Sequence, residues 1–327
     1  RRATVMPNYN GVWSLSTHYQ YRTGWPTTLL GTPIGVFTSG HNSNVLDFVD
    51  INTTGNATDF GDATAVKYNT QGHGNNTRGI TGYGGTNATT TIDFISMASK
   101  GNAADFGDTA TAFGAHRGGG CGNNTRGVFG GATANNSNII EYVTMANLGN
   151  GTDFGNLSLA RARLTATSSA TRGVFAGGYT ASANFVDTID YIAIGTTGNA
   201  SDFGNLTSSG RTFAAAFASA TRGVFAGGYK DGVGSQYTNI VDYITIGSTG
   251  NATDFGDQTQ ASRVASAGSG ETKTVFAGSG AGGGDRNFID IITTASTGNA
   301  SDFGDLSDTA GSNRTAAGNA TPSQQPS

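Results

Sequence analysis

The stretch GNATDFGD at residues 55–62 recurs five more times along the chain, and this repetition decides the fold. The further copies read GNAADFGD (101–108), GNGTDFGN (149–156), GNASDFGN (198–205), GNATDFGD (250–257) and GNASDFGD (298–305). Successive copies begin about 50 residues apart, and self-similarity at such a period is typical of a repeat architecture. The chain therefore contains six copies of one structural unit.

Two other segments precede every copy in a fixed order. The first is a short apolar run that in most units ends in glycines, such as TRGVFAGGY at 171–179 and again at 221–229. Glycine permits turn dihedrals that other residues avoid, so this run predicts a buried strand followed by a turn. The second segment alternates β-branched and aromatic residues, as in TIDYIA at 188–193, and predicts another strand.

Each unit reads as four short strands, without helical periodicity. One strand is expected at each DFG, and a weakly alternating stretch such as RTFAAAFAS at 211–219 supplies the strand that starts the next unit. A four-stranded unit of about 40–50 residues has the size of a propeller blade. The sequence therefore predicts an all-β fold, a six-bladed β-propeller with four-stranded antiparallel blades.

The first unit lacks a strand upstream of Ile34, and the chain continues past the last DFG. We expect residues 311–321 to supply the missing strand of the first blade, which closes the ring and removes its open sheet edges. The expected parts of the chain are an aromatic-rich extension (1–32), the propeller (33–321) and a C-terminal tail (322–327).

The spacing of glycines and aromatics within a unit resembles the Kelch repeat. In this sequence, Tyr191 follows Gly178 by 13 residues, and Phe203 lies 12 residues after Tyr191. The Kelch family places Gly-Gly after its second strand, Tyr in its third and Trp near its fourth. Phenylalanine stands at the Trp position in every unit, at Phe60, Phe106, Phe154, Phe203, Phe255 and Phe303. The resemblance covers 33–321 and implies the propeller fold, but Kelch propellers serve enzymes, adaptors and adhesins alike.

The amino-acid sequence of the repeats is also similar to repeat arrays in structural proteins of tailed phages that infect cyanobacteria. This resemblance rests on the GNA-x-DFG and TRGVFAGG segments. It implies a virion structural or adsorption protein, such as a tail, fibre or decoration component.

Composition excludes several other classes of protein. The chain of 327 residues has 52 glycines, only 12% charged residues and a net charge of −4. A nucleic-acid-binding surface needs a basic stripe, which this sequence lacks. No run of 18 apolar residues occurs, so we expect no membrane insertion. The single cysteine, Cys121, can form neither an internal disulfide nor a multi-cysteine zinc site.

Acidic residues recur once per unit within the expected third strands, at Asp47, Asp93, Glu141, Asp190, Asp242 and Asp290. Six equivalent acids look like structural ion-pair partners and not like a catalytic pair. Their expected partners are Arg78, Arg126, Arg172 and Arg222. The aspartates of the DFG motifs, such as Asp59, are expected to cap the preceding turn by accepting backbone N–H groups.

No singular constellation of catalytic or metal-binding residues occurs in the sequence. The four histidines, His18, His41, His73 and His116, stand at non-equivalent positions and show no metal-binding spacing. Glycosidase chemistry needs paired carboxylates or an arginine cluster in the pore. We expect no catalytic residue, no metal and no cofactor, and a carbohydrate-active enzyme is the less favoured alternative.

Strand parity predicts the binding face. In a four-stranded antiparallel blade, the loops from strand two to three and from strand four to one emerge on the same face. These loops differ between units, and variable loops on a regular scaffold commonly carry recognition. Their aromatic and charged residues are the candidate binding residues, namely Tyr179, Tyr229, Lys230, Asp231, Tyr237 and Arg286.

The extension at 1–32 holds a second aromatic set, Trp13, Tyr19, Tyr21 and Trp25. These residues either pack on the propeller or dock onto another subunit.

We expect a non-enzymatic virion protein that presents a propeller face, extracellular as part of the particle. Its expected partners are other virion structural proteins or a glycan or protein of the host surface, and a homo-oligomer is left open. The alternative is a secreted or cell-surface adhesin on the same scaffold.

Overall fold

The computed structural model divides the chain into two units, Arg1–Gly31 and Thr32–Ser327. The structure describes these residues of the second unit: 33–38, 43–66, 70–82, 90–97, 99–110, 118–132, 137–182, 184–208, 210–212, 214–230, 236–270, 272–279, 287–307 and 315–318. The extension, with Trp13, Tyr19, Tyr21 and Trp25, and the tail at 322–327 lie outside the described residues. No helix long and apolar enough to span a membrane was found in the ranges above.

Six four-stranded antiparallel sheets make up most of the described structure, and we number them in chain order. Sheet 1 contains β27 (Thr315–Gly318), β1 (Ile34–Thr38), β2 (Val45–Asp50) and β3 (Thr58–Asp62). Sheet 2 contains β4 (Gln71–Gly74), β5 (Arg78–Gly82), β6 (Thr91–Ser96) and β7 (Ala104–Asp108). Sheet 3 contains β8 (Gly119–Gly122), β9 (Arg126–Ala132), β10 (Ser137–Thr144) and β11 (Thr152–Asn156).

The remaining sheets follow the same order along the chain. Sheet 4 contains β12 (Thr165–Ser168), β13 (Arg172–Ala176), β14 (Thr188–Ala193) and β15 (Ser201–Asn205). Sheet 5 contains β17 (Ala215–Ala218), β18 (Arg222–Ala226), β21 (Ile240–Thr245) and β22 (Thr253–Asp257). Sheet 6 contains β23 (Arg263–Ser269), β24 (Lys273–Ser279), β25 (Phe288–Thr293) and β26 (Ser301–Asp305).

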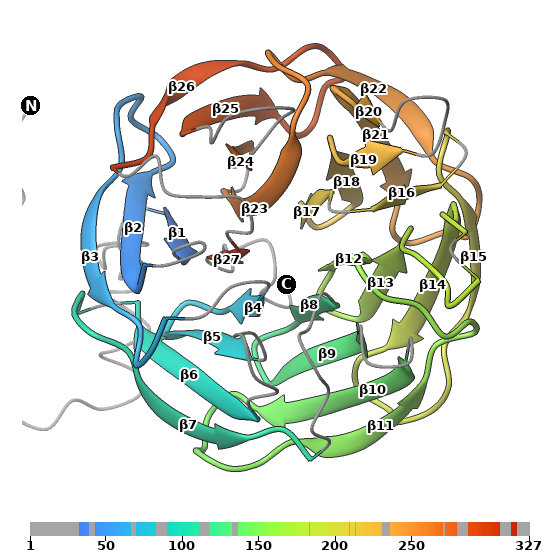
Figure 1. Ribbon diagram of the computed structural model, residues 1–327, viewed down its shortest axis with the longest axis horizontal. Coiled ribbons are helices and arrows are strands. Elements are labelled where there is room, and N and C mark those ends of the chain that lie inside the picture. Colours follow the sequence, from blue (N-terminus) through green and yellow to red (C-terminus); the bar gives the residue numbers. More distant parts are fainter. Residues whose placement is uncertain are drawn as a thin grey trace, which may run out of the picture. The chain divides into compact units, whose positions relative to one another are not determined.

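Within the unit Thr32–Ser327, the sheets follow one another around a centre, and the architecture is β-propeller-like (Figure 1). In each sheet the DFG strand lies outermost, and the innermost strands of the six sheets are β27, β4, β8, β12, β17 and β23 (Figure 1). The inner strands β27, β4, β8, β12, β17 and β23 contact one another in that order, and β23 in turn contacts β27. The described residues contain strands and turns and no helix, as expected for an all-β chain.

The GNA and DFG segments of neighbouring sheets join through backbone hydrogen bonds. Gly101 N donates to Phe60 O at 2.8 Å, Ala103 N donates to Asp62 O at 2.7 Å, and Asp62 N donates to Asn102 Oδ1 at 3.0 Å. The same Gly-to-Phe bond recurs in Gly149–Phe106, Gly198–Phe154, Gly250–Phe203, Gly298–Phe255 and Gly55–Phe303. The GNA and DFG segments, the most repetitive part of the sequence, therefore form the junctions between neighbouring sheets, which we call seams.

The glycine of each DFG motif is required by this close approach. Gly61 has a φ of +147°, and a Cβ there would lie 2.4 Å from the carbonyl carbon of Gly101. A register shift between the third and fourth strands falls next to this point in sheet 1, between Leu46 and Asp47. Asp59 Oδ1 accepts the N–H of Gly61 at 3.1 Å, so this exposed aspartate stabilises the irregularity after it and not the turn before it.

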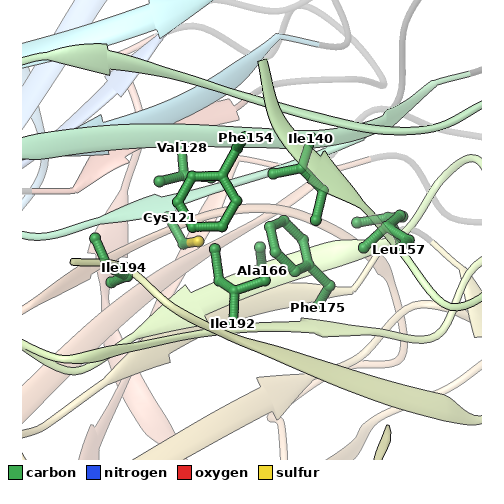
Figure 2. Packing of buried hydrophobic residues seen from close by; sticks show 10 residues of the cluster. Cys121, Val128, Ile140, Phe154, Leu157, Ala166, Phe175, Ile192 and Ile194 are labelled. Atoms are coloured by element: carbon green, nitrogen blue, oxygen red, sulfur yellow. The ribbon is translucent and has the colours of Figure 1, made fainter. Parts of the chain in front are cut away.

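Apolar side chains fill the space between successive sheets. Figure 2 shows one such cluster, in which Val128 and Ile140 of sheet 3 pack with Phe175 and Ile192 of sheet 4. Phe154, of the DFG motif, lies in the same cluster and makes an edge contact with Tyr142 at 5.9 Å between ring centroids. The repeated phenylalanine thus belongs to the core that holds two sheets together.

The expected ion pairs between the third-strand acids and the second-strand arginines are wrong. The acids are buried and accept hydrogen bonds from the connection that leads into their own sheet, as when Ser158 Oγ donates to Asp190 at 2.6 Å. Arg172 instead lies over the ring of Tyr191, at 4.8 Å from its centroid, and donates to Ile246 O at 2.9 Å in the next sheet. The other second-strand arginines make the same two contacts. Each lies over an aromatic ring and donates to a backbone carbonyl oxygen, namely Arg78, Arg126 and Arg222. The second-strand arginines therefore join neighbouring sheets, whereas the acids hold the connection that leads into their own sheet, and Asp190 and Asp242 form their ion pairs with Arg161 and Arg211 of that connection.

Candidate functional site

In sheets 4 and 5, the loop from strand two to three meets the connection that precedes strand one, and we call the face that they form the loop face. In sheet 5, β16 (Arg211–Thr212) of the connection pairs with β19 (Tyr229–Lys230) of the loop, and β19 pairs with β20 (Gln236–Tyr237). The three strands form a small separate sheet (Figure 1). In sheet 4, Tyr179 of the loop bridges Ala162 of the connection and Phe185. Strand parity predicted this arrangement.

Four aromatic side chains form a continuous row on the loop face, which we call the aromatic row. The ring centroids of Tyr179 and Phe185 are 5.7 Å apart, those of Phe185 and Tyr229 5.8 Å, and those of Tyr229 and Tyr237 5.5 Å. All four side chains are half-buried, so each keeps part of its surface in contact with solvent. The row crosses from the loop of sheet 4 to that of sheet 5.

Two arginines lie against the aromatic row. The guanidinium carbon of Arg163 is 5.0 Å from the ring centroid of Tyr179. That of Arg263 is 6.0 Å from the centroid of Tyr229 and 5.8 Å from that of Tyr237. Burial lowers the pKa of Arg163, the interactions with Tyr179 and Tyr229 oppose this, and the positive charge of Arg263 lowers the pKa further. Both cations therefore act on the same small surface.

The backbone of Arg163 adopts a conformation that side chains other than glycine rarely take. Its φ is +58°, in the left-handed region. The residues before it are held firmly, because Arg161 is buried and Ala162 forms an isolated antiparallel β-bridge with Tyr179. Such local strain persists where the surroundings impose it, and it is found often at functional sites.

A buried arginine anchors each of the two connections beneath the loop face. Arg161 Nη2 lies 3.1 Å from Asp190 Oδ2 and donates to Phe175 O at 3.1 Å, and both side chains of the ion pair are 0% exposed. Arg211 forms the corresponding buried ion pair with Asp242 and donates to Ile240 O at 3.0 Å. Burial lowers the pKa of both arginines, and the neighbouring aspartate opposes this. The aromatic row therefore rests on fixed connections.

The structure brings together three of the six candidate binding residues. Tyr179, Tyr229 and Tyr237 lie in the aromatic row, whereas Lys230 lies on β19 opposite Gln236. Asp231 and Arg286 lie outside the described residues. Sequence reasoning missed Phe185, Arg163 and Arg263. The type of the two arginines was no signal, since an arginine also stands in the stretch that follows other DFG motifs, as at Arg117, Arg211 and Arg314.

Other candidate chemical groups are buried and structural. Burial lowers the pKa of His73 to about 4, and its Nε2 lies 3.1 Å from the carbonyl oxygen of Asn123, to which the neutral ring donates. Burial raises the pKa of Cys121, which keeps its thiol protonated and unreactive. No group of three metal-ligating side chains was found among the described residues.

Lowering the pH from 7 to 5 is expected to reduce the free energy of unfolding by about 2 kcal/mol through His73 alone. Its pKa is about 4 in the folded protein, against an ordinary value of 6.5, so between these values the unfolded chain binds a proton that the folded protein does not. The contribution is complete above pH 6.5 and is lost as the pH falls towards 4. Urea unfolding of the wild type and of His73→Gln at both pH values measures it. An equal pH loss in the two proteins would contradict the assignment.

Comparison with protein-family models gave no match to this chain, and comparison with curated proteins gave none either.

Proposed function

We propose that the unit Thr32–Ser327 is a six-bladed propeller, with sheets 1–6 as its blades and β27 as the strand that closes the ring. The antiparallel pairing of β27 with β1 supports this. Hydrogen bonds between the two ends of the repeat array also support it. Ser307 Oγ donates to Asp47 at 2.6 Å, and Asp305 N donates to Asn56 Oδ1 at 3.0 Å.

We further propose that this propeller is a non-enzymatic binding module that uses the loop face. The aromatic row with Arg163 and Arg263 is the observation that carries this proposal. Partly exposed tyrosine and arginine dominate the binding energy of many interfaces. The row is built from loops that differ between units, and a repeated frame of buried side chains holds it in place.

The biological setting that we propose is a virion, with this chain as a tail, fibre or decoration component. The similarity of the repeats to phage structural proteins supports the setting. The partners would be other virion proteins or a glycan or protein on the host surface. Immunogold labelling of purified particles with an antibody against this chain tests it. Label on the cell envelope in the absence of particles would favour the adhesin instead.

The double variant Tyr229→Ala with Lys230→Ala is expected to weaken attachment to the partner surface at least about tenfold. Tyr229 contacts both Phe185 and Tyr237, so its truncation interrupts the aromatic row in the middle. The melting temperature should stay nearly constant, because both residues lie outside the clusters between sheets. Attachment is measured as the fraction of labelled protein or particles retained by the partner cells.

Asn199→Ala is the matched control and should show the opposite pattern. Its side-chain oxygen accepts the N–H of Asn156 at 3.0 Å in a seam between sheets. Loss of this bond should cost about 1 kcal/mol of stability and leave attachment of the folded protein unchanged. If attachment survives the Tyr229 and Lys230 changes, the loop face is not the binding surface.

A further inference from the structure

We propose that the face opposite the loop face docks onto a carboxylate-rich surface of another protein through six cationic side chains. This face, which we call the turn face, is made by the turns from strand one to two and from strand three to four. The two kinds of turn join through backbone hydrogen bonds, such as Ile194 N to Thr171 O at 2.9 Å. Because the turn face and the loop face are separate surfaces, each can be tested without the other.

The six side chains, which we call the cationic set, stand at corresponding places around the turn face. Sheets 2 to 5 each begin their second strand with an arginine, and sheet 6 begins its second strand with Lys273. Sheet 1 has Ile34 there, and Lys100 of the neighbouring turn supplies the charge, with its Nζ 3.7 Å from the ring centroid of Phe48. Because the sheets follow one another around a centre (Figure 1), the charges are distributed around it. The cationic set consists of Arg78, Arg126, Arg172, Arg222, Lys273 and Lys100.

A positive charge is present even where it cannot join two sheets. The four arginines lie over an aromatic ring of the third strand and donate to a carbonyl oxygen of the next sheet. In sheet 6 the residue in register with that ring is Ile291, and the side chain of Lys273 is exposed. Stabilisation of the sheets therefore accounts for the arginines but not for the charge of Lys273.

The surroundings of the cationic set supply little negative charge. The described turns of the turn face contain no acidic residue. Asp50, at the end of β2, is half-buried and accepts the N–H of Asn52 at 2.9 Å. None of the six cationic side chains forms an ion pair with a described residue. Electrostatic complementarity therefore favours a negatively charged partner.

The arginines keep the edge of the guanidinium that suits a carboxylate. In all four it is Nη1 that donates to the carbonyl oxygen, as from Arg172 to Ile246 O at 2.9 Å. Their Nε and Nη2 groups form no hydrogen bond with the part of the chain that the structure describes. These two groups form a planar edge that can bind a carboxylate through two parallel hydrogen bonds.

Fixed charges and an exposed apolar side chain favour a folded protein as the partner. Each arginine is held by a ring and a carbonyl, so its charge can match a carboxylate at a fixed position with little loss of conformational entropy. Leu148 is 57% exposed in the turn of sheet 3, where sheets 4 to 6 have threonine, and it offers an apolar contact among the charges. Neutral turn residues separate the charges, whereas a nucleic acid needs a continuous basic stripe.

A short polyglutamate peptide is the probe, because it presents several carboxylates on a polypeptide. The wild-type protein should bind the labelled peptide in a fluorescence anisotropy titration, and binding should weaken as the salt concentration rises. The double variant Lys100→Gln with Lys273→Gln should weaken binding about fivefold. Its melting temperature should stay nearly constant, because both side chains are exposed.

Lys230→Gln is the matched control, because it removes a lysine of the loop face, and it should bind the peptide like the wild type. Carbodiimide coupling joins a lysine amine to a carboxylate in contact with it, and mass spectrometry should find the peptide on Lys100 and Lys273. Absence of binding, an equal loss in Lys230→Gln, or coupling at Lys230 alone would overturn the inference. Tighter binding of duplex DNA or of phosphatidylglycerol vesicles than of the peptide would overturn the assignment to a protein partner.

The two assays distinguish the turn face from the loop face. The Lys100 and Lys273 double variant should attach to the partner cells of the proposed function like the wild type. The Tyr229 and Lys230 double variant should bind the peptide like the wild type, and a loss of peptide binding there would contradict the turn face as the docking surface. If the peptide does not bind while that variant still loses attachment, the loop face remains the binding surface and only the turn face is refuted.

Discussion

Deletion of residues 311–327 is expected to destabilise the whole repeat unit and to lower its melting temperature. β27 is the inner strand of sheet 1, and it contacts β4 and β23 as well as β1. At about 1 kcal/mol for each ladder hydrogen bond, its pairing with β1 alone is worth about 4 kcal/mol. The exposed edge of β1 would also offer a template for pairing with other chains, so the shortened protein should self-associate.

Thermal melts and analytical ultracentrifugation of the full chain and the deletion variant measure this effect. A chain shortened only by residues 322–327 is the control, and it should melt like the full chain. An unchanged midpoint together with monomeric behaviour after deletion of 311–327 would show that β27 does not close a ring.

Asp242→Ala is expected to destabilise the protein by about 3–5 kcal/mol, which lowers its melting temperature by about 5–10 °C. The carboxylate forms an ion pair with Arg211, and both side chains are 0% exposed. It also accepts a hydrogen bond from Thr207 of the adjoining connection. The substitution leaves a buried guanidinium without its counter-charge, which costs far more than the loss of an exposed ion pair.

Asp254→Ala is the control for this prediction. Asp254 lies opposite Asp242 in the same pair of strands but is exposed. Its removal should change the free energy of unfolding by no more than about 0.5 kcal/mol. Chemical denaturation of both variants decides the matter. Equal effects of the two substitutions would show that the buried ion pair adds nothing to stability.

The sequence predicted the strands of the sheets well, because each repeated segment consists of residues that locally favour a strand or a turn. The Gly-rich apolar runs became the second strands, such as Arg172–Ala176, and the alternating segments became the third strands, such as Thr188–Ala193. The strand expected within 311–321 lies at Thr315–Gly318 and pairs with β1. Six repetitions of one pattern left little freedom in the order of strands.

Side-chain partners across the seams could not be predicted in the same way. Arg161 and Arg172 both precede Asp190 in the sequence, and the sequence of the repeat does not indicate which of the two arginines forms an ion pair with it. The choice of ion-pair partner depends on which face of the sheet each arginine side chain occupies and on how far that side chain is buried. Asp59 was misjudged for a similar reason, since its role as an acceptor of a backbone N–H was expected, but the donor is Gly61, which lies beside a register shift between the third and fourth strands.

The loop face was located by parity, but its composition was only half predicted. Tyr179, Tyr229 and Tyr237 were selected because of their residue type. Phe185, Arg163 and Arg263 join them only because two loops, one connection and the start of β23 meet in space. A row assembled from four separate segments leaves no contiguous motif to recognise.

The seams between sheets also bear on how such a protein can evolve. The hydrogen bonds between the GNA and DFG segments involve chiefly backbone groups and one asparagine, as in Gly101, Asn102 and Phe60, so these bonds can form with any neighbour that carries the same two segments. Unequal recombination between near-identical gene segments can therefore exchange one repeat for another without a mismatch in these hydrogen bonds. The loops would travel with the exchanged segment. A lineage could in this way renew its recognition surface by shuffling whole repeats, while the frame that carries it is inherited unchanged.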